Sequence, residues 1–188
     1  MRYDGLNERI DEVMGQMVPK TNRLLLMFAT PKDAALAKKG KPEDLERYMM
    51  IQTFRQGENV KVTAKDFAQI LKGLDAQMSS SAESGQLASE VNEQLKKTKD
   101  AKDLKLGETV ILGTFHKTES SVDMGMLTKV QVGKDEPKSM AGAFSISLLR
   151  GKVVYIYVYS GYYAPEDIAW TRKTVKDWRE AIVAANQE

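Results

Sequence analysis

The spacing of hydrophobic residues divides the sequence, because a period of two appears only in its second half. From Val122 to Val132 most apolar residues share one parity, and polar residues such as Asp123 and Lys129 hold the other. A period of two is typical of a β-strand with one buried face. The sequence therefore predicts an antiparallel strand here, with Asp123 and Lys129 on a face that meets water.

Two apolar runs on either side of Arg150-Gly151 predict a β-hairpin. Residues 140–149 precede this dipeptide and residues 152–160 follow it. Glycine at the second position of a two-residue loop fits a hairpin turn. The register places Phe144 opposite Tyr157, so one face of the hairpin is large and aromatic, while the other carries small and branched residues. The same register pairs Leu148 with Val153, Ile146 with Tyr155, and Gly142 with Tyr159.

The last segment predicts a long amphipathic helix that covers the sheet. Pro165 suits its first turn, and its apolar residues fall on one stripe of a helical wheel. That stripe consists of Ile168, Val175, Trp178, Ile182 and Ala185. We expect the helix to bury the branched face of the preceding strand, which is formed by Val154, Ile156 and Val158. The tyrosine face then needs a second layer, for which the helix predicted over 63–78 is the best candidate.

The first half predicts more helix than strand. Helical spacing or capping residues indicate helices over 6–17, 31–40, 63–78 and 87–95, and a solvated connector over 96–105. A short apolar run predicts a buried strand over 23–29, with a buried helix segment as the alternative, and the pattern over 47–55 also indicates a strand. We therefore expect a single α+β domain over 1–188, with an antiparallel sheet flanked by helices on both faces. Its helix-rich part is expected over 1–105, and its sheet with the closing helix over 109–187.

Composition excludes several classes of chemistry. The chain has no cysteine, so disulfides, thiolate catalysis and cysteine-ligated zinc are absent. The 28 basic and 26 acidic residues nearly balance, which gives no general nucleic-acid footprint. Glycine-rich phosphate loops and the HExxH zinc motif are missing, and no apolar run is long enough to span a membrane. We expect no cofactor, no metal and no integral membrane segment.

The C-terminal pattern resembles that of a known superfamily. The run from Gly151 to Tyr159, followed by Glu166 to Trp170, Trp178 and Asn186, is similar to the end of PsbP-like proteins. That superfamily includes photosystem extrinsic subunits, Ran-binding relatives, bacterial lipoproteins and secretion-system chaperones. The resemblance covers the sequence from about residue 109 onward. It implies an antiparallel sheet flanked by helices and a binding or assembly role without chemistry of its own, and it transfers no functional residue.

Candidate site residues are few. His116 is the only histidine, and any serine or zinc chemistry would have to recruit it; Ser120, Ser121 and Asp123 lie close to it in sequence. A strand-end histidine near the surface is the alternative interpretation. A row of hydroxyl-bearing aromatics is the other candidate, because such a row can line a ligand cleft or a partner surface. It consists of Tyr155, Tyr157, Tyr159, Tyr162 and Tyr163, and its alternative role is to fill the core.

We therefore predict a non-enzymatic binding or assembly protein with a protein partner and no nucleic acid. The expected setting is bacterial and extracytoplasmic, with a signal segment removed. The first alternative is a cytoplasmic chaperone or adaptor of the same fold, which we would expect to be a homodimer. A hydrolase that uses His116 is the second.

Overall fold

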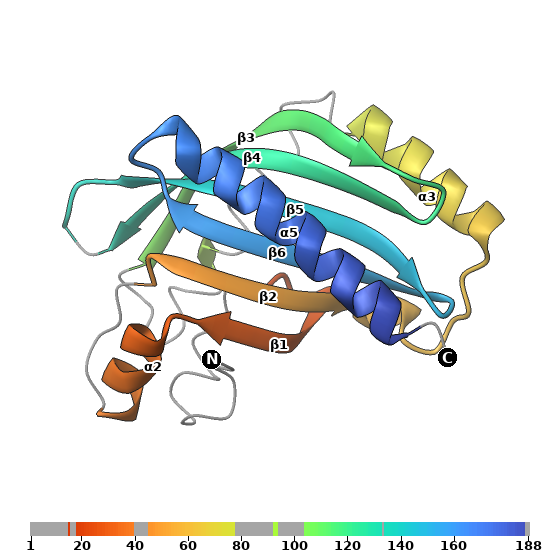
Figure 1. Ribbon diagram of the computed structural model, residues 1–188, viewed down its shortest axis with the longest axis horizontal. Helices are drawn as coiled ribbons and strands as arrows, with labels where there is room; N and C mark the ends of the chain where they lie inside the picture. Colours follow the sequence, from red (N-terminus) through yellow and green to blue (C-terminus); the bar gives the residue numbers. More distant parts are fainter. Residues whose placement is uncertain are drawn as a thin grey trace.

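The chain forms one antiparallel sheet with helices packed against it (Figure 1). The computed structural model covers residues 1–188 and describes residues 15, 18–39, 45–77, 92–93, 104–132 and 134–186. The sheet has six strands in the order β1-β2-β6-β5-β4-β3. The strands are β1 (Asn22–Ala29), β2 (Arg47–Phe54), β3 (Leu104–Lys117), β4 (Ser121–Val132), β5 (Lys138–Leu149) and β6 (Lys152–Gly161). The described α-helices are α2 (Pro31–Lys38), α3 (Ala64–Gln77) and α5 (Pro165–Ala185). The predicted α+β class is confirmed.

The prediction of a helix-rich first half is wrong. The strands expected over 23–29 and 47–55 are confirmed as β1 and β2, and they join the same sheet as the second half through the β2–β6 pairing. β3 begins at Leu104, so the sheet also starts earlier than residue 109. The sheet needs these strands because β6, apolar on both faces, would otherwise lie at an edge. Most of the helices predicted over 6–17 and 87–95, and most of the connector over 96–105, fall outside the described residues; residues 15, 92 and 93, which are described, are helical.

The β5–β6 hairpin has the predicted register. Phe144 pairs with Tyr157, and the other three predicted pairs are present as well. Arg150 and Gly151 both have positive φ, at 49° and 78°. Two consecutive positive φ values define the hairpin turn whose twist matches that of the flanking strands, and a glycine at the second position adopts it without strain. The turn therefore fixes which residues of β6 face each side.

α5 covers one face of the sheet, as predicted. Ile156, Val158 and Val175 are fully buried in one cluster, and Trp178 and Ile182 pack against it. Val154 is only half-buried, because it lies near the end of the sheet. The helix begins at Pro165, and the Asp167 carboxylate accepts a hydrogen bond from the backbone N–H of Ala164 at 3.1 Å. Burial of this branched face fixes the helix on the sheet.

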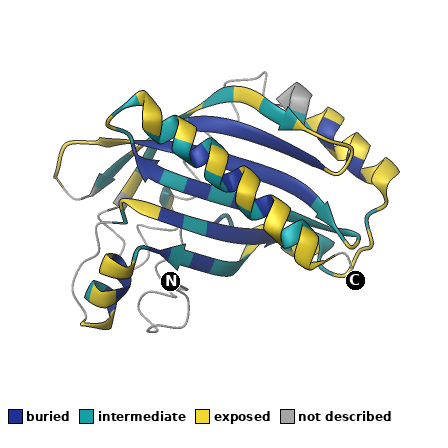
Figure 2. Ribbon diagram, viewed as in Figure 1, coloured by how far each residue is buried: buried dark blue, intermediate teal, exposed yellow. Residues whose placement is uncertain are grey.

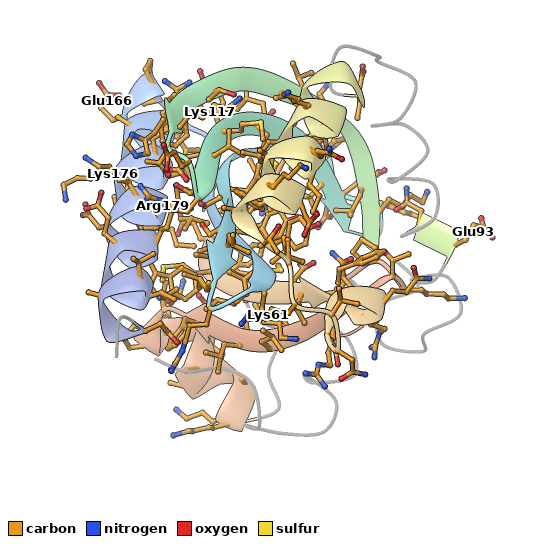
Figure 3. The ribbon with its side chains drawn as sticks, turned by 90° about the vertical axis from the view of Figure 1, so that its right-hand side faces the viewer. Lys61, Glu93, Lys117, Glu166, Lys176 and Arg179 are labelled. Carbon is orange, nitrogen blue, oxygen red and sulfur yellow. The ribbon has the colours of Figure 1, made fainter. Side chains whose placement is uncertain are left out.

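α3 packs on the opposite face (Figure 3). Its buried Phe67 and Leu71 contact Val122 and Met124 of β4. The helix is capped by Thr63, whose backbone N–H donates a hydrogen bond to the Asp66 carboxylate at 3.0 Å. The backbone N–H of Asp66 in turn donates to the Thr63 hydroxyl at 3.2 Å. Thr63 and Asp66, three residues apart, thus form a capping box that starts the helix. The tyrosine face therefore has the second layer that it needs.

β4 has no wet face in its first half, which corrects the sequence prediction. Asp123 is completely buried, and so is its neighbour of the same parity, Gly125. Figure 2 shows that burial is concentrated in the central strands, beneath α5. The polar parity of β4 faces the helix instead of solvent, and Arg179 of α5 supplies a partner for Asp123. A strand pattern alone does not distinguish water from a polar helix face.

Candidate functional site

Three of the five candidate tyrosines lie among the packed residues of the sheet. Tyr157 and Tyr159 are mostly buried and contact both core clusters on the α3 side, and Tyr155 packs against one of them. Tyr159 stacks on Tyr48 of β2, with ring centroids 4.7 Å apart and planes 19° apart. Phe144 continues the row on the other side, stacked on Tyr157 at 5.7 Å. These rings therefore hold β2, β6 and β5 together instead of lining an open surface.

Burial changes the acidity of this row. Loss of water contact raises the pKa of Tyr48, Tyr157 and Tyr159 well above the ordinary value of 10.0. The pKa of Tyr155 is also raised by burial. Each phenol stays protonated at neutral pH, so none of these four hydroxyls is prepared to act as a base.

His116 lies beside Asp123 but is not joined to it. The two residues pair across β3 and β4, and Asp123 bonds Arg179 instead. The hydroxyl of Ser121 lies 2.8 Å from that of Thr118. Among the described residues, no hydrogen bond links His116 to a serine, a threonine or a carboxylate. The contact between base and nucleophile that a hydrolase requires is therefore not formed here.

The two remaining candidates, Tyr162 and Tyr163, line a pocket of about 440 Å³ where β6 ends. Ligand pockets commonly measure 300 to 1,000 Å³, so this one has an ordinary size for binding. Its apolar lining residues are buried or half-buried, whereas its carboxylates are exposed. The apolar residues are Leu45, Val130 and Met140, and the carboxylates are Glu46, Asp135 and Glu136. The pocket thus has an apolar base and an acidic rim.

Backbone hydrogen bonds fix the wall of this pocket. Gly161 donates its N–H to the carbonyl of Glu46 at 2.8 Å, and Tyr162 donates to the carbonyl of Ser139 at 2.9 Å. Tyr163 is 75% exposed, yet its ring lies over Gly161, where an added Cβ would come within 2.8 Å of it. The backbone N–H of Tyr163 donates to the Asp167 carboxylate at 3.0 Å. An exposed aromatic ring is therefore held in a defined place beside the pocket.

Leu45 in the pocket lining has a strained backbone. Its φ is 45°, in the left-handed region that leucine rarely adopts. The side chain of Asp33 at the start of α2, which is buried, accepts the N–H of Leu45 at 3.3 Å and a hydrogen bond from Thr30 at 2.6 Å. Strained residues that the surrounding structure holds in place are found frequently at functional sites. The pocket lining therefore includes a residue whose strained backbone is held by a buried carboxylate.

Sequence reasoning missed most of this pocket. It singled out Tyr162 and Tyr163 as part of one row with Tyr155, Tyr157 and Tyr159, but the strand end separates the two groups. The acidic rim comes from Glu46, just before β2, and from the loop before β5, and these two segments are distant in sequence. The only available signal was the charged loop over 133–138, and nothing in the sequence connects that loop to Glu46 or Leu45.

Other classes of site find little support in the part of the chain that the structure describes. The described residues contain no group of three or more histidine or carboxylate side chains placed to hold a metal ion. None of the described helices combines the length and the apolar character needed to cross a membrane. No protein-family model matches the sequence, and no curated protein matches it either.

Proposed function

We propose that this chain is a non-enzymatic binding or assembly protein whose protein partner docks where β6 ends. The observation that carries the proposal is Tyr163, an exposed aromatic ring that lies over Gly161 beside a pocket. Tyrosine is enriched among the residues that dominate binding energy at protein interfaces.

Site-specific photo-crosslinking tests this proposal. Tyr163 is replaced by p-benzoylphenylalanine, and the variant is irradiated in an extract of the source cells. A matched control carries the same residue at Val60, which is 53% exposed and lies at the opposite end of β6, where Lys152 bonds its carbonyl. We expect a discrete protein adduct at position 163 that excess unmodified protein suppresses. Equal adducts at both positions, or none, would contradict the proposal.

The adduct then identifies a partner for a direct measurement. Mass spectrometry names the crosslinked protein, and the purified pair is studied by calorimetry. Tyr163→Ala is expected to weaken binding by about 2 kcal/mol, or roughly 30-fold, if the ring is an interface anchor. Val60→Ala, the matched control, is expected to leave the affinity unchanged. An unchanged affinity in Tyr163→Ala would place the contact elsewhere.

The bacterial, extracytoplasmic setting belongs to the same proposal and rests on the resemblance to PsbP-like proteins. Upstream codons that encode an apolar signal segment would support it. The cytoplasmic alternative predicts that the protein is a homodimer, and sedimentation of the purified chain measures its oligomeric state directly. If the protein is a monomer and no partner crosslinks at Tyr163, both the extracytoplasmic and the cytoplasmic version of the proposal are contradicted.

A further inference from the structure

The lining of the Tyr163 pocket has two chemical parts. Its base is formed by Leu45, Val130 and Met140, of which Met140 is only 8% exposed. Its rim carries Glu46, Asp135 and Glu136, and Lys138 is the one cation among the lining residues that the structure describes. No ion pair joins the three carboxylates to another described residue. The lining therefore presents an apolar base below a rim with a net negative charge.

Resting on the proposed function, we infer that this pocket receives a lysine or arginine side chain from the protein partner. These side chains place a flexible apolar stem below a cationic head, which matches an apolar base below carboxylates. The exposed ring of Tyr163 adds a face over which a cation is attracted. An acidic side chain would be repelled by the rim, and a purely apolar one would remove water from the carboxylates without replacing it.

The occupant belongs to a protein and not to a free polyamine because of what surrounds the pocket. Tyr163 lines the pocket and is 75% exposed, so it offers a large uncovered aromatic surface that a protein partner would bury. An exposed aromatic ring beside a charged pocket provides both contact area and orientation for a protein surface. Complementary charge at a rim chiefly increases the association rate and the selectivity of binding.

Nuclear magnetic resonance with defined peptides tests the inference. The ¹⁵N-labelled protein is titrated with a decapeptide of alternating lysine and serine, and separately with one of alternating glutamate and serine. We expect the lysine peptide to shift the amide signals of Glu46, Ser139 and Gly161, and the glutamate peptide to leave them in place. Added salt should weaken the effect, because exposed charge pairs are screened.

A charge-matched pair of variants separates the site from net charge. We expect one triple variant to bind the lysine peptide roughly tenfold more weakly than the unmodified protein does. It carries Glu46→Gln, Asp135→Asn and Glu136→Gln. The control variant neutralises the same number of carboxylates elsewhere, as Glu119→Gln, Asp177→Asn and Glu180→Gln, and should bind as the unmodified protein does. Equal weakening in both variants, or shifts spread over the whole surface, would overturn the inference.

Three further outcomes distinguish this inference from the proposed function. If the variant with the three neutralised carboxylates still crosslinks to a partner at position 163 in full yield, the inference that a basic side chain enters the pocket is wrong. The proposal that the partner docks at Tyr163 is then retained. If spermidine shifts the same amides as strongly as the lysine peptide, the ligand is a free polyamine and the inference is wrong. If no partner crosslinks at position 163, the proposed function fails whatever the peptides do.

Discussion

The guanidinium Nε of Arg179 on α5 donates to Oδ2 of Asp123 on β4 at 3.2 Å, and both side chains are buried. Figure 3 shows Arg179 on the side of the helix that faces the sheet, whereas Lys176 points away from it. The pair lies beneath the helix, next to the serines of β5. Its position indicates that it sets the register of α5 on the sheet, since a buried charge tolerates few alternative partners.

Removing one member of this pair is therefore expected to destabilise the fold strongly. Arg179→Met alone should lower the free energy of unfolding by about 3 to 5 kcal/mol, because it leaves Asp123 as an uncompensated buried charge. Asp123→Val alone should cost less, because Arg179 keeps a second carboxylate, that of Glu180, at 3.6 Å. The double variant should recover most of that loss. Urea denaturation measures all three. The exposed pair Lys173 and Asp177 is the control, and its neutralisation should change stability by less than about 0.5 kcal/mol.

Ile156 provides a test of the α5 face. Its side chain is fully buried among Val158 and Val175. Ile156→Asp is expected to unfold the protein, because an unpaired buried carboxylate costs several kcal/mol of a total stability of about 5 to 15 kcal/mol. Val60→Asp, at a position that is 53% exposed, should remain folded by circular dichroism. A stable Ile156→Asp variant would show that α5 does not cover this face.

The buried tyrosines make the protein sensitive to alkaline pH. Because burial raises the pKa of Tyr48, Tyr157 and Tyr159 above 10.0, the folded state holds these protons more tightly than the unfolded chain does. Their contribution to the stability of the folded state is complete below pH 10, and it is lost as the pH rises toward the pKa values that they have in the folded protein. We expect the tyrosinate absorbance at 295 nm that these three rings contribute to appear only together with unfolding. Absorbance that corresponds to all seven tyrosines in a chain still folded by circular dichroism would contradict this.

Gly161 tests whether the Tyr163 ring is held in place. A Cβ added there would meet the ring at 2.8 Å, and the ring end of an exposed side chain can move away at little cost. The free energy of unfolding of Gly161→Ala should therefore lie within about 1 kcal/mol of that of the unmodified protein, while the Tyr163 ring moves from its position. The Tyr163 ring signals in the nuclear magnetic resonance spectrum should shift. Unchanged signals would mean that the ring is not packed on Gly161.

Several elements were predictable because their signals are local. The Arg150-Gly151 loop fixed the β5–β6 register, and with it the partners of all the β6 tyrosines. The Thr63–Asp66 capping box and Pro165 marked the starts of α3 and α5. Each of these depends on residues within a few positions of one another. Backbone conformation at a turn or a cap responds to exactly such neighbours, so the sequence suffices there.

The sequence by itself determined the α+β class, the hairpin, and the helix that covers β6. Only the tertiary structure decided that Asp123 is buried against Arg179, and that Tyr162 and Tyr163 leave the tyrosine row to line a pocket with Glu46. These relationships join segments far apart in the chain. Alternation along a strand specifies two faces but not what lies over each, because that depends on how the strands and helices pack together.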